Sequence, residues 1–384
     1  MTTTINNEHK KLNVPNLRFP EFQGEWEEST IGEMFDLYSG NTPSRLNKEH
    51  FKGTVNWISS GELKEHYIYS SKEQISEEAA KSLKLLPVGT FVIAIYGLEA
   101  EGVRGTGSIT QEPSTISQAC MSFIQKGEIG NEFLYSWYKK HGNVIGIRYA
   151  QGTKQQNLSY DILEKFRIVY PKTKEQEKLN KLISLLDERI STQNKIIDKL
   201  QSLIKGLRVS LIQMENGNIV HLGEIAQIYQ PQTISSTELT EDGFLVYGAN
   251  GIIGKYKQYN HKTEQICITC RGNTCGMVNY TKPMSWITGN AMVINTDEHQ
   301  NKVCKRYLYH YLSAYNFNSI ISGSGQPQIV RTPLEQLKVP LPTFLEQKQK
   351  ATFLDIIQGK IEISNKTLNL YLQQKQYLLR QMFI

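Results

Sequence analysis

Two long stretches of the chain carry apolar residues at spacings that alternate between four and three. They span residues 179–211 and 354–382, and each holds one polar residue near its centre, Gln193 or Ser364. A stripe with a period of 3.5 residues buries best against another such stripe, so we expect the two helices to pair as a coiled coil. The residues expected at the contact are Leu186, Ile190, Gln193, Ile197, Leu200, Ile204 and Leu207 in the first helix, and Ile357, Ile361, Ser364, Leu368, Tyr371 and Leu378 in the second. The alternative, in which each helix packs only on its own domain, would need a shorter repeat.

Outside these helices, short apolar runs bounded by turn residues predict β-strands. Such runs occur at residues 91–97 and 119–124, and again at 265–272 and 291–294. The dipeptide Asn250-Gly251 lies between apolar residues and is a signal for a β-hairpin. The pattern therefore predicts an α+β protein with two β-rich mixed domains in tandem, each followed by a long helix. The expected segments are 17–171 for the first domain, 172–214 for the central helix, 220–342 for the second domain and 343–384 for the last helix.

The two halves of the chain share their ends but not their middles. The segment from Gly152 to Gln176 recurs 171 residues later as Gly323 to Gln347, whereas Ile31-Gly32-Glu33 recurs at an offset of 191 as 222–224. Offsets that differ by 20 indicate equivalent frames that hold inserts of unequal length. Such a protein is suited to recognise two different features along one pseudo-symmetric target.

The recurring segments also predict where the long helices begin. Thr173 with Gln176, and Thr343 with Glu346, have the spacing of a capping box, in which two side chains bond each other's backbone amides. We therefore expect both long helices to open at these threonines.

Composition limits the class of protein but does not fix a partner. The net charge is +6, and residues 1–171 carry a net charge of −2, so the positive excess lies in the rest of the chain. Charge alone therefore leaves nucleic-acid binding open. No run of 18 apolar residues occurs and the first residues lack the apolar core of a signal peptide, so we expect a soluble, cytoplasmic protein without membrane contact. Five cysteines without paired spacing argue against a disulfide framework.

The sequence contains no recognisable catalytic motif, and its one cysteine cluster is a weak metal candidate. Cys267 and Cys270, with Cys275 nearby, look like half of a zinc site, but no second pair follows and a strand would place the first two on opposite faces. We expect structural thiols and no metal. Phosphate-binding glycine loops, the His-Glu-x-x-His motif and the Gly-x-Ser-x-Gly elbow do not occur, nor do the Asn-Pro-Pro-Tyr and Asp-Pro-Pro-Tyr tetrapeptides of amino-methyltransferases. This absence favours binding over catalysis.

Polar loops at strand ends are the better candidates for function. Arg271 and Asn273 follow a predicted strand, and these residue types can bond guanine and adenine in the major groove. Tyr96 is the positional partner of Arg271 in the first domain. The loops 152–156 and 323–327 recur in both halves, so contact with phosphate or packing at the helix base suits them better than sequence recognition. The alternative for any of these residues is an ordinary surface turn. The full set of candidate DNA-binding residues is Ser59, Ser60, Lys64, Tyr96, Lys154, Gln155, Asn250, Lys255, Arg271, Asn273, Thr274, Gln326 and Arg331.

The order of motifs resembles a known family over essentially the whole chain. These motifs are residues 17–22 with Trp26, residues 31–33, 57–61 and 246–251, and both Gly-x-x-Gln…Leu-Glu…Pro…Glu-Gln segments. Together they are similar to the specificity (S) subunit of type I restriction-modification enzymes. The resemblance implies two target recognition domains separated by antiparallel helices, with pseudo-two-fold symmetry and no active site.

The resemblance also implies partners. Each domain would recognise one half of a bipartite sequence in double-stranded DNA, while the helices would set the spacer and dock two methyltransferase (M) subunits. Restriction (R) subunits would complete the nuclease. S-adenosylmethionine, ATP and Mg²⁺ are implied for those subunits, and no cofactor is implied for this chain. Two other functions stay open: a self-contained DNA methyltransferase or nuclease, and a coiled-coil scaffold with two protein-binding domains.

Overall fold

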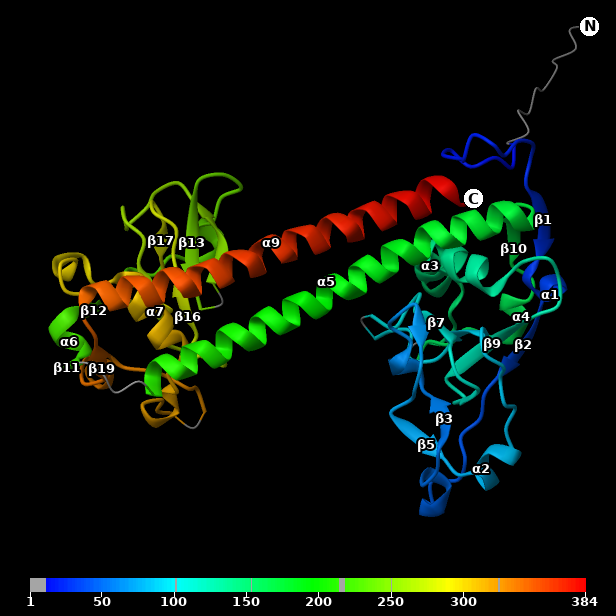
Figure 1. Cartoon of the computed structure of the whole chain (residues 1–384), viewed down its shortest axis with the longest axis horizontal. Helices are drawn as coiled ribbons and strands as arrows, with labels where there is room; N and C mark the ends of the chain where they lie inside the picture. Colours follow the sequence, from blue (N-terminus) through cyan, green and yellow to red (C-terminus); the bar gives the residue numbers. More distant parts are fainter. Residues whose placement is uncertain (1–11, 101, 153, 214–217, 250, 324) are drawn as a thin grey trace, which may run out of the picture. The chain divides into compact units, whose positions relative to one another are not determined.

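The computed structural model describes residues 12–384 except for 101, 153, 214–217, 250 and 324. The chain forms two compact units. Unit 1 comprises Met1–Gln193 with Thr367–Ile384, and unit 2 comprises Asn194–Lys366. The long helices α5 (Thr173–Gln213) and α9 (Phe344–Met382) each contribute one part to each unit (Figure 1). No helix in the described part of the chain is both long enough and apolar enough to cross a membrane.

Unit 1 is built on three small sheets with the helix α3 packed on the largest. The strand orders are β2-β9-β6-β7-β4, β5-β3-β8 and β1-β10. The strands are β1 (Glu27–Thr30), β2 (Phe35–Ser39), β3 (Val55–Ile58), β4 (Tyr67–Ile68), β5 (Glu73–Ile75), β6 (Phe91–Ala94), β7 (Gly107–Thr110), β8 (Ser114–Ile116), β9 (Cys120–Gln125) and β10 (Arg167–Tyr170). The helices are α1 (Ile31–Met34), α2 (Glu77–Lys81), α3 (Asn131–Tyr149) and α4 (Tyr160–Leu163), with 3-10 turns η1 (Lys48–Phe51) and η2 (Ser60–Glu62).

Unit 2 repeats this plan with a different set of strands. Its sheets have the orders β12-β18-β15-β16, β14-β13-β17 and β11-β19. The strands are β11 (Asn218–His221), β12 (Gln227–Tyr229), β13 (Phe244–Gly248), β14 (Gly251–Tyr256), β15 (Ile266–Thr269), β16 (Val278–Tyr280), β17 (Trp286–Ile287), β18 (Ala291–Asn295) and β19 (Lys338–Leu341). The helices are α6 (Leu222–Ile225), α7 (Lys305–Ala314) and α8 (Arg331–Glu335), with 3-10 turns η3 (Ser236–Glu238), η4 (Asp297–His299) and η5 (Phe317–Ser319).

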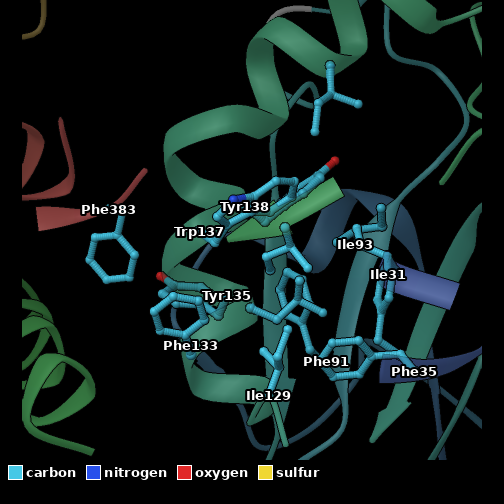
Figure 2. Packing of buried hydrophobic residues seen from close by; sticks show 14 of the residues in the cluster. Ile31, Phe35, Phe91, Ile93, Ile129, Phe133, Tyr135, Trp137, Tyr138 and Phe383 are labelled. Atoms are coloured by element: carbon cyan, nitrogen blue, oxygen red, sulfur yellow. The ribbon is translucent and has the colours of Figure 1, made fainter. Parts of the chain in front are cut away.

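The core of unit 1 forms where the apolar strand β6 meets α3. Phe91 and Ile93 are fully buried, and Phe91 packs edge-on against Tyr135 of α3 (Figure 2). The end of the chain joins this core, because Phe383 is also buried and its ring lies 5.3 Å from that of Phe133. The strands predicted from the runs at 91–97 and 119–124 are thereby confirmed as β6 and β9.

Within both units the long helices run antiparallel, as the fold prediction expected. Lys375 of α9 forms an ion pair with Asp187 of α5 in unit 1, and Arg208 of α5 donates to Gln358 of α9 (3.4 Å) in unit 2. Later residues of α5 therefore contact earlier residues of α9, as in an antiparallel pair. Among the predicted contact residues, Leu186, Ile197, Ile204, Ile357 and Ile361 are buried, and Ile190, Gln193, Leu200, Leu207, Ser364, Leu368, Tyr371 and Leu378 are half-buried.

A recurring glutamine joins each long helix to its domain. Gln176 accepts a hydrogen bond from the Gly130 amide (3.0 Å) and donates to the carbonyls of Glu128 (3.2 Å) and Pro171 (2.8 Å). The capping box predicted for Gln176 with Thr173 is therefore wrong, because the glutamine is buried and bonds the turn before α3 instead.

The equivalent glutamine of unit 2 makes the same contacts. Gln347 accepts from the Cys304 amide (2.9 Å) and donates to the carbonyls of Lys302 (3.0 Å) and Pro342 (2.8 Å). The capping box predicted next to it is confirmed, since Thr343 and Glu346 bond each other's backbone amides. The recurrence of the Glu-Gln dipeptide thus reflects a shared junction between domain and helix.

Candidate nucleic-acid interface

In unit 2 the loop after β15 lies against the recurring loop 322–328. Arg271 forms an isolated β-bridge with Gln328, and the Gly272 amide donates to the Pro327 carbonyl (3.0 Å). The Ile329 amide donates to the Cys270 carbonyl (3.0 Å) and continues this pairing. The structure therefore brings together two loops that the sequence singled out separately.

Unit 1 has the same arrangement with different side chains. Tyr96 bridges Asn157, the Leu98 amide donates to the Gln156 carbonyl (3.2 Å), and the Leu158 amide donates to the Ile95 carbonyl (2.9 Å). These contacts give Tyr96 the structural position that Arg271 has in unit 2. The aromatic side chain is 37% exposed, and Arg271 is also exposed.

A third segment meets the loop pair at the end of β3 or β13. In unit 2 the hydroxyls of Thr269 and Thr274 both donate to the Ala249 carbonyl, which ties the β13–β14 turn to the Arg271 loop. Asn250, the candidate in that turn, lies outside the described residues.

The matching segment of unit 1 contains Ser59 and Ser60. The Ser117 amide donates to the Ile58 carbonyl (2.9 Å), as the Thr288 amide donates to the Tyr247 carbonyl (3.0 Å) in unit 2. Ser59 is half-buried and its hydroxyl bonds Glu62 (2.6 Å), so this serine caps the turn η2, and Ser60 begins that turn.

The remaining candidates differ in how freely their side chains project. Lys64, Lys154, Gln155, Asn273 and Gln326 are exposed. Lys255 forms an ion pair with Asp242 (3.3 Å), and Arg331 forms one with Glu335 one helical turn away (2.6 Å). Such exposed pairs are weak and do not prevent either cation from contacting another anion.

The recurring glycines are explained by the shape of their loops. Gly152 has a φ of +103° and Gly323 a φ of +89°, a region that favours glycine. A Cβ atom would lie 2.2 Å from the Gln155 carbonyl oxygen at Gly152, and 2.5 Å from the Gln326 carbonyl oxygen at Gly323. These glycines therefore recur because the turn itself requires them.

One charged residue of the loop pair in unit 1 was not among the candidates. Arg104 donates to the Gln156 side chain (3.0 Å), and the Gln156 amide donates to Glu99 (2.8 Å). Arg104 lies between Gly102 and Gly105, which both have a positive φ. Two glycines that closely flank an arginine in the sequence could have indicated a tight loop that carries a basic residue.

Cys267 of β15 and Cys270, which follows that strand, pack into two different hydrophobic clusters. Cys267 lies with Tyr247 and Ile287, whereas Cys270 lies in the main core of unit 2. Burial raises the pKa of the Cys267 thiol to about 12 and also raises the pKa of Cys270. Within the described residues, no group of three or more His, Cys, Asp or Glu side chains is placed to hold a metal ion.

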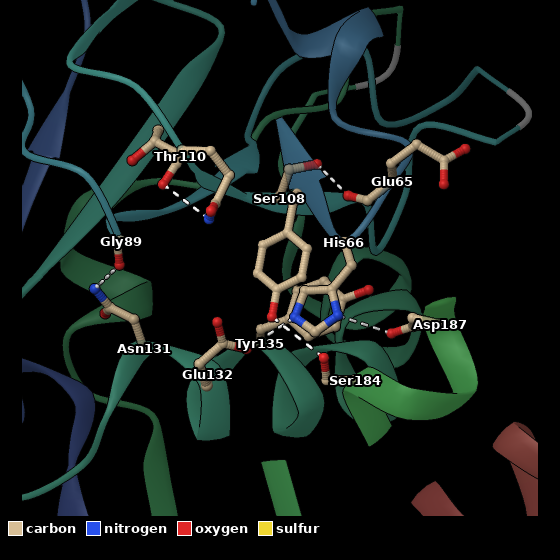
Figure 3. A network of polar contacts seen from close by, with 12 residues as sticks. Glu65, His66, Gly89, Ser108, Thr110, Asn131, Glu132, Tyr135, Ser184 and Asp187 are labelled. Atoms are coloured by element: carbon tan, nitrogen blue, oxygen red, sulfur yellow. Dashed lines mark hydrogen bonds and ion pairs between the residues drawn. The ribbon is translucent and has the colours of Figure 1, made fainter. Parts of the chain in front are cut away.

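A buried histidine connects the first domain to both long helices. His66 is stacked between Tyr67 and Tyr135, with ring centroids 4.1 and 4.0 Å away. Its Nε2 lies 2.8 Å from Glu132 and its Nδ1 lies 2.9 Å from Asp187 (Figure 3). Asp187 also pairs with Lys375 of α9.

These two carboxylates control the charge of His66. Burial opposes the charged ring, but Asp187 and Glu132 outweigh that effect and raise the pKa of His66 above its ordinary value. Lys139 lies nearby, and burial together with the charge of Lys375 lowers its pKa to about 8.

Unit 2 also has a histidine where its domain meets the long helices, but arginines lie beside this one. His310 of α7 is fully buried, its Nε2 donates to Asp355 of α9 (2.8 Å), and its Nδ1 accepts from Arg208 of α5 (3.2 Å). Arg306 pairs with the same Asp355. Burial lowers the pKa of His310, and the two arginines act in the same direction.

Known proteins share this sequence pattern and architecture. The family model of the type I restriction modification DNA specificity domain matches the chain twice, over residues 23–202 and 214–372. The specificity subunit of the type I restriction enzyme EcoprrI from Escherichia coli is 25% identical over 359 residues, which cover 85% of this chain and 86% of that protein. The MjaVIII specificity subunit from Methanocaldococcus jannaschii is 23% identical over 401 residues, covering 91% and 89%.

A solved structure has the same fold. The crystal structure of a type I restriction-modification S subunit from M. genitalium matches with a TM-score of 0.71 at 18% identity, and the match covers 97% of this chain and 99% of that one. Two matched specificity domains that span most of the sequence, on a fold of two domains with long antiparallel helices, show that the chain belongs to the family of type I restriction-modification specificity subunits.

Proposed function

We propose that each unit recognises one half of a bipartite sequence in double-stranded DNA, and that this chain supplies no catalytic group. The observation that carries the proposal is the exchange of Tyr96 for Arg271 at one structural position. The backbone that presents these residues is the same in both units, whereas the side chains differ in shape, charge and hydrogen bonding. A shared backbone arrangement that presents different side chains in the two units suits two half-sites of different sequence.

The chemistry of the two positions suits contact with bases. An exposed guanidinium such as that of Arg271 can donate two parallel hydrogen bonds to guanine O6 and N7. The phenol of Tyr96 can donate or accept one hydrogen bond and can pack against a thymine methyl group. Lys154 and Gln155 on the neighbouring loop are exposed, and they suit contact with phosphate.

The outer face of the long helices suits the docking of methyltransferase subunits. Ile356, Ile363, Leu370 and Tyr377 recur at intervals of seven along α9 and are 55 to 65% exposed. Leu185, Ile196 and Leu203 of α5 are exposed to a lesser extent. Exposed apolar residues in such a register mark a surface that a partner protein covers. The same pair of helices would set the spacer between the half-sites.

S-adenosylmethionine, ATP and Mg²⁺ then belong to the M and R subunits of a cytoplasmic complex. Where the structure describes the loop pairs, no group of three or more carboxylates, histidines or cysteines is placed to hold a metal ion, and the sequence has no phosphate-binding glycine loop. The rival function, a self-contained methyltransferase or nuclease, predicts turnover by the purified chain alone.

The proposal is tested by sequencing methylated adenines in cells that express the chain with its M partner. We expect a split motif that vanishes without the chain. Arg271→Ala should relax or weaken one half of that motif by about 1–3 kcal/mol per lost base contact, and Tyr96→Ala should affect only the other half. Tyr69→Ala, at an exposed tyrosine of unit 1 that is not among the candidates, serves as the matched control for Tyr96→Ala. If either loop variant changed both halves, or neither, the division of labour between the units would be refuted.

A further inference from the structure

The hairpin β13–β14 contains an irregularity that exposes two consecutive isoleucines. Tyr247 pairs with Ile252 and Val246 pairs with Gly254, so Ile253 is an extra residue in β14. Consecutive side chains of a regular strand point to opposite faces, but a β-bulge re-aims one of them. Ile252 is consequently 55% exposed and Ile253 44% exposed.

The hairpin is held beside the Arg271 loop. Its turn is tied there by the hydroxyls of Thr269 and Thr274, which donate to the Ala249 carbonyl. Gly251 opens β14 with a φ of +83°, and a Cβ atom there would lie 3.5 Å from the Asn279 side chain of β16. The end of β13 and the start of β14, which carries the isoleucines, therefore lie next to the Arg271 loop.

Among the described residues of unit 1, the segment that follows β3 holds no such apolar pair. After β3 the chain enters the short turn η2, which carries Ser59 and Ser60 and packs against β6. β14 is also the edge strand of its sheet, where adjacent exposed isoleucines are an aggregation hazard that proteins generally avoid. A ligand that covers the pair would explain why unit 2 retains it.

We propose that Ile252 and Ile253 contact the 5-methyl groups of thymines in the half-site that unit 2 recognises. The inference rests on the proposed function. A two-stranded ribbon fits the major groove, and the thymine methyl is the one apolar group that the base edges display there. With Arg271 beside them, the isoleucines would let unit 2 recognise A·T pairs by shape while the arginine recognises guanine.

The test uses the complex of this chain with its M partner and duplexes that carry the methylation motif. Deoxyuridine, which lacks only the methyl group, replaces each thymine of the second half-site in turn. We expect the affinity to fall about fourfold at one or two positions, the value of one methyl group removed from water. The variant Ile252→Ala/Ile253→Ala should bind thymine and uracil duplexes equally. Deoxyuridine in the first half-site should change the affinity of both proteins by the same factor, because the isoleucines belong to unit 2.

Ile219→Ala is the matched control, because Ile219 is an exposed isoleucine of unit 2 on a different sheet. Hydrogen exchange of β13 and β14 checks that the double variant is folded. The proposal is overturned if no thymine of the second half-site is sensitive to uridine, or if that half-site contains only G·C pairs. It is also overturned if the double variant fails to bind the M subunit without DNA, since the pair would then be a protein contact. Failure of the proposed function looks different, because the wild-type complex would then show no preference for the motif.

Discussion

Gln176 in unit 1 and Gln347 in unit 2 make the same three hydrogen bonds, whereas the helices beside them pack in different ways. In unit 1 the residues Leu179 and Ile183 of α5, with Leu379 of α9, belong to the main core of the domain. Lys140 and His141 of α3 also bond the carbonyls of the last two residues of the chain. The helical pair of unit 1 is thus part of the domain.

In unit 2 the helices form a separate cluster. Ile204 packs with Leu354, Ile357 and Ile361, and this group is distinct from the core that surrounds β15. Charged and polar contacts join the two instead, from Arg306 and His310 of α7 to Asp355 of α9. The recurring residues therefore preserve the junction between domain and helix, while the packing of the elements around that junction differs between the two units.

The largest expected effect separates the two ways of packing. Ile204→Asp places a charge in the helical cluster of unit 2 and should cost about 5 kcal/mol of stability. Because that cluster is separate from the domain core, the loss should appear in hydrogen exchange of α5 and α9 and spare β15 and β18. Ile183→Asp should cost as much but expose the whole of unit 1. Leu203→Asp, on an exposed neighbour, is the control and should leave exchange unchanged. If the loss of protection spread from the helices to the sheets equally in both units, the helices of unit 2 would not be a separate cluster in terms of stability.

The next effect tests the shared junction. Gln176→Met and Gln347→Met keep the side-chain volume but leave one amide and two carbonyls without partners. Each lost bond to a buried group costs about 1–3 kcal/mol, so both variants should lose about 4 kcal/mol in chemical denaturation. The two losses should agree within about 1 kcal/mol because the bonds are the same. A large loss in one unit alone would show that the repeated dipeptide has different roles.

The residue just before each glutamine should behave unequally. Glu175 is 3% exposed and accepts two bonds from the half-buried Arg18 (2.8 and 2.7 Å). Glu175→Ala removes the carboxylate and leaves the guanidinium only the carbonyls of Gln23 and Gly24, so it should cost about 3 kcal/mol. Glu346 is exposed and only closes the capping box, so Glu346→Ala should cost about 1 kcal/mol or less. Thermal unfolding of both variants measures the difference. Similar losses of stability in the two variants would mean that the contact with Arg18 adds nothing to the stability of unit 1.

The sequence predicted the features that depend on local pattern. The heptad repeat indicated both long helices. The position at the end of a predicted strand matched Tyr96 with Arg271, which proved to share one structural position. The Asn-Gly dipeptide indicated the hairpin, and β13 and β14 flank it.

Features that depend on distant partners were not predictable. Gln176 bonds backbone groups of residues 128–130, which no side-chain motif marks. The pairing of His66 with Asp187 joins residues 121 positions apart, and the sequence around either one is unremarkable. The bulge at Ile253 depends on the register of the whole hairpin, which a run of apolar and glycine residues does not fix.

The smallest expected effect concerns the two junction histidines, which should respond to pH in opposite senses. Both ring nitrogens of His66 face carboxylates, so the folded state raises its pKa above the unfolded value of about 6.5. That stabilisation is complete below about pH 6.5 and is lost as the pH rises through the folded value. Burial lowers the pKa of His310, and the bond that its Nδ1 accepts from Arg208 acts in the same direction. Unit 2 should therefore lose stability as the pH falls below about 6.5.

Hydrogen exchange of α3 and α7 between about pH 5 and 7.5, corrected for the intrinsic rate, measures these trends separately. Over this range Lys139 stays mostly charged, because its pKa is about 8, and the pH stays above the lowered pKa values of Asp187 and Asp355. His66→Gln should abolish the trend in α3 alone, and His310→Gln the trend in α7 alone. If α3 and α7 instead gained and lost protection together, the pH response would come from a group common to both units. The electrostatic contrast between the two junctions would then have no consequence for stability.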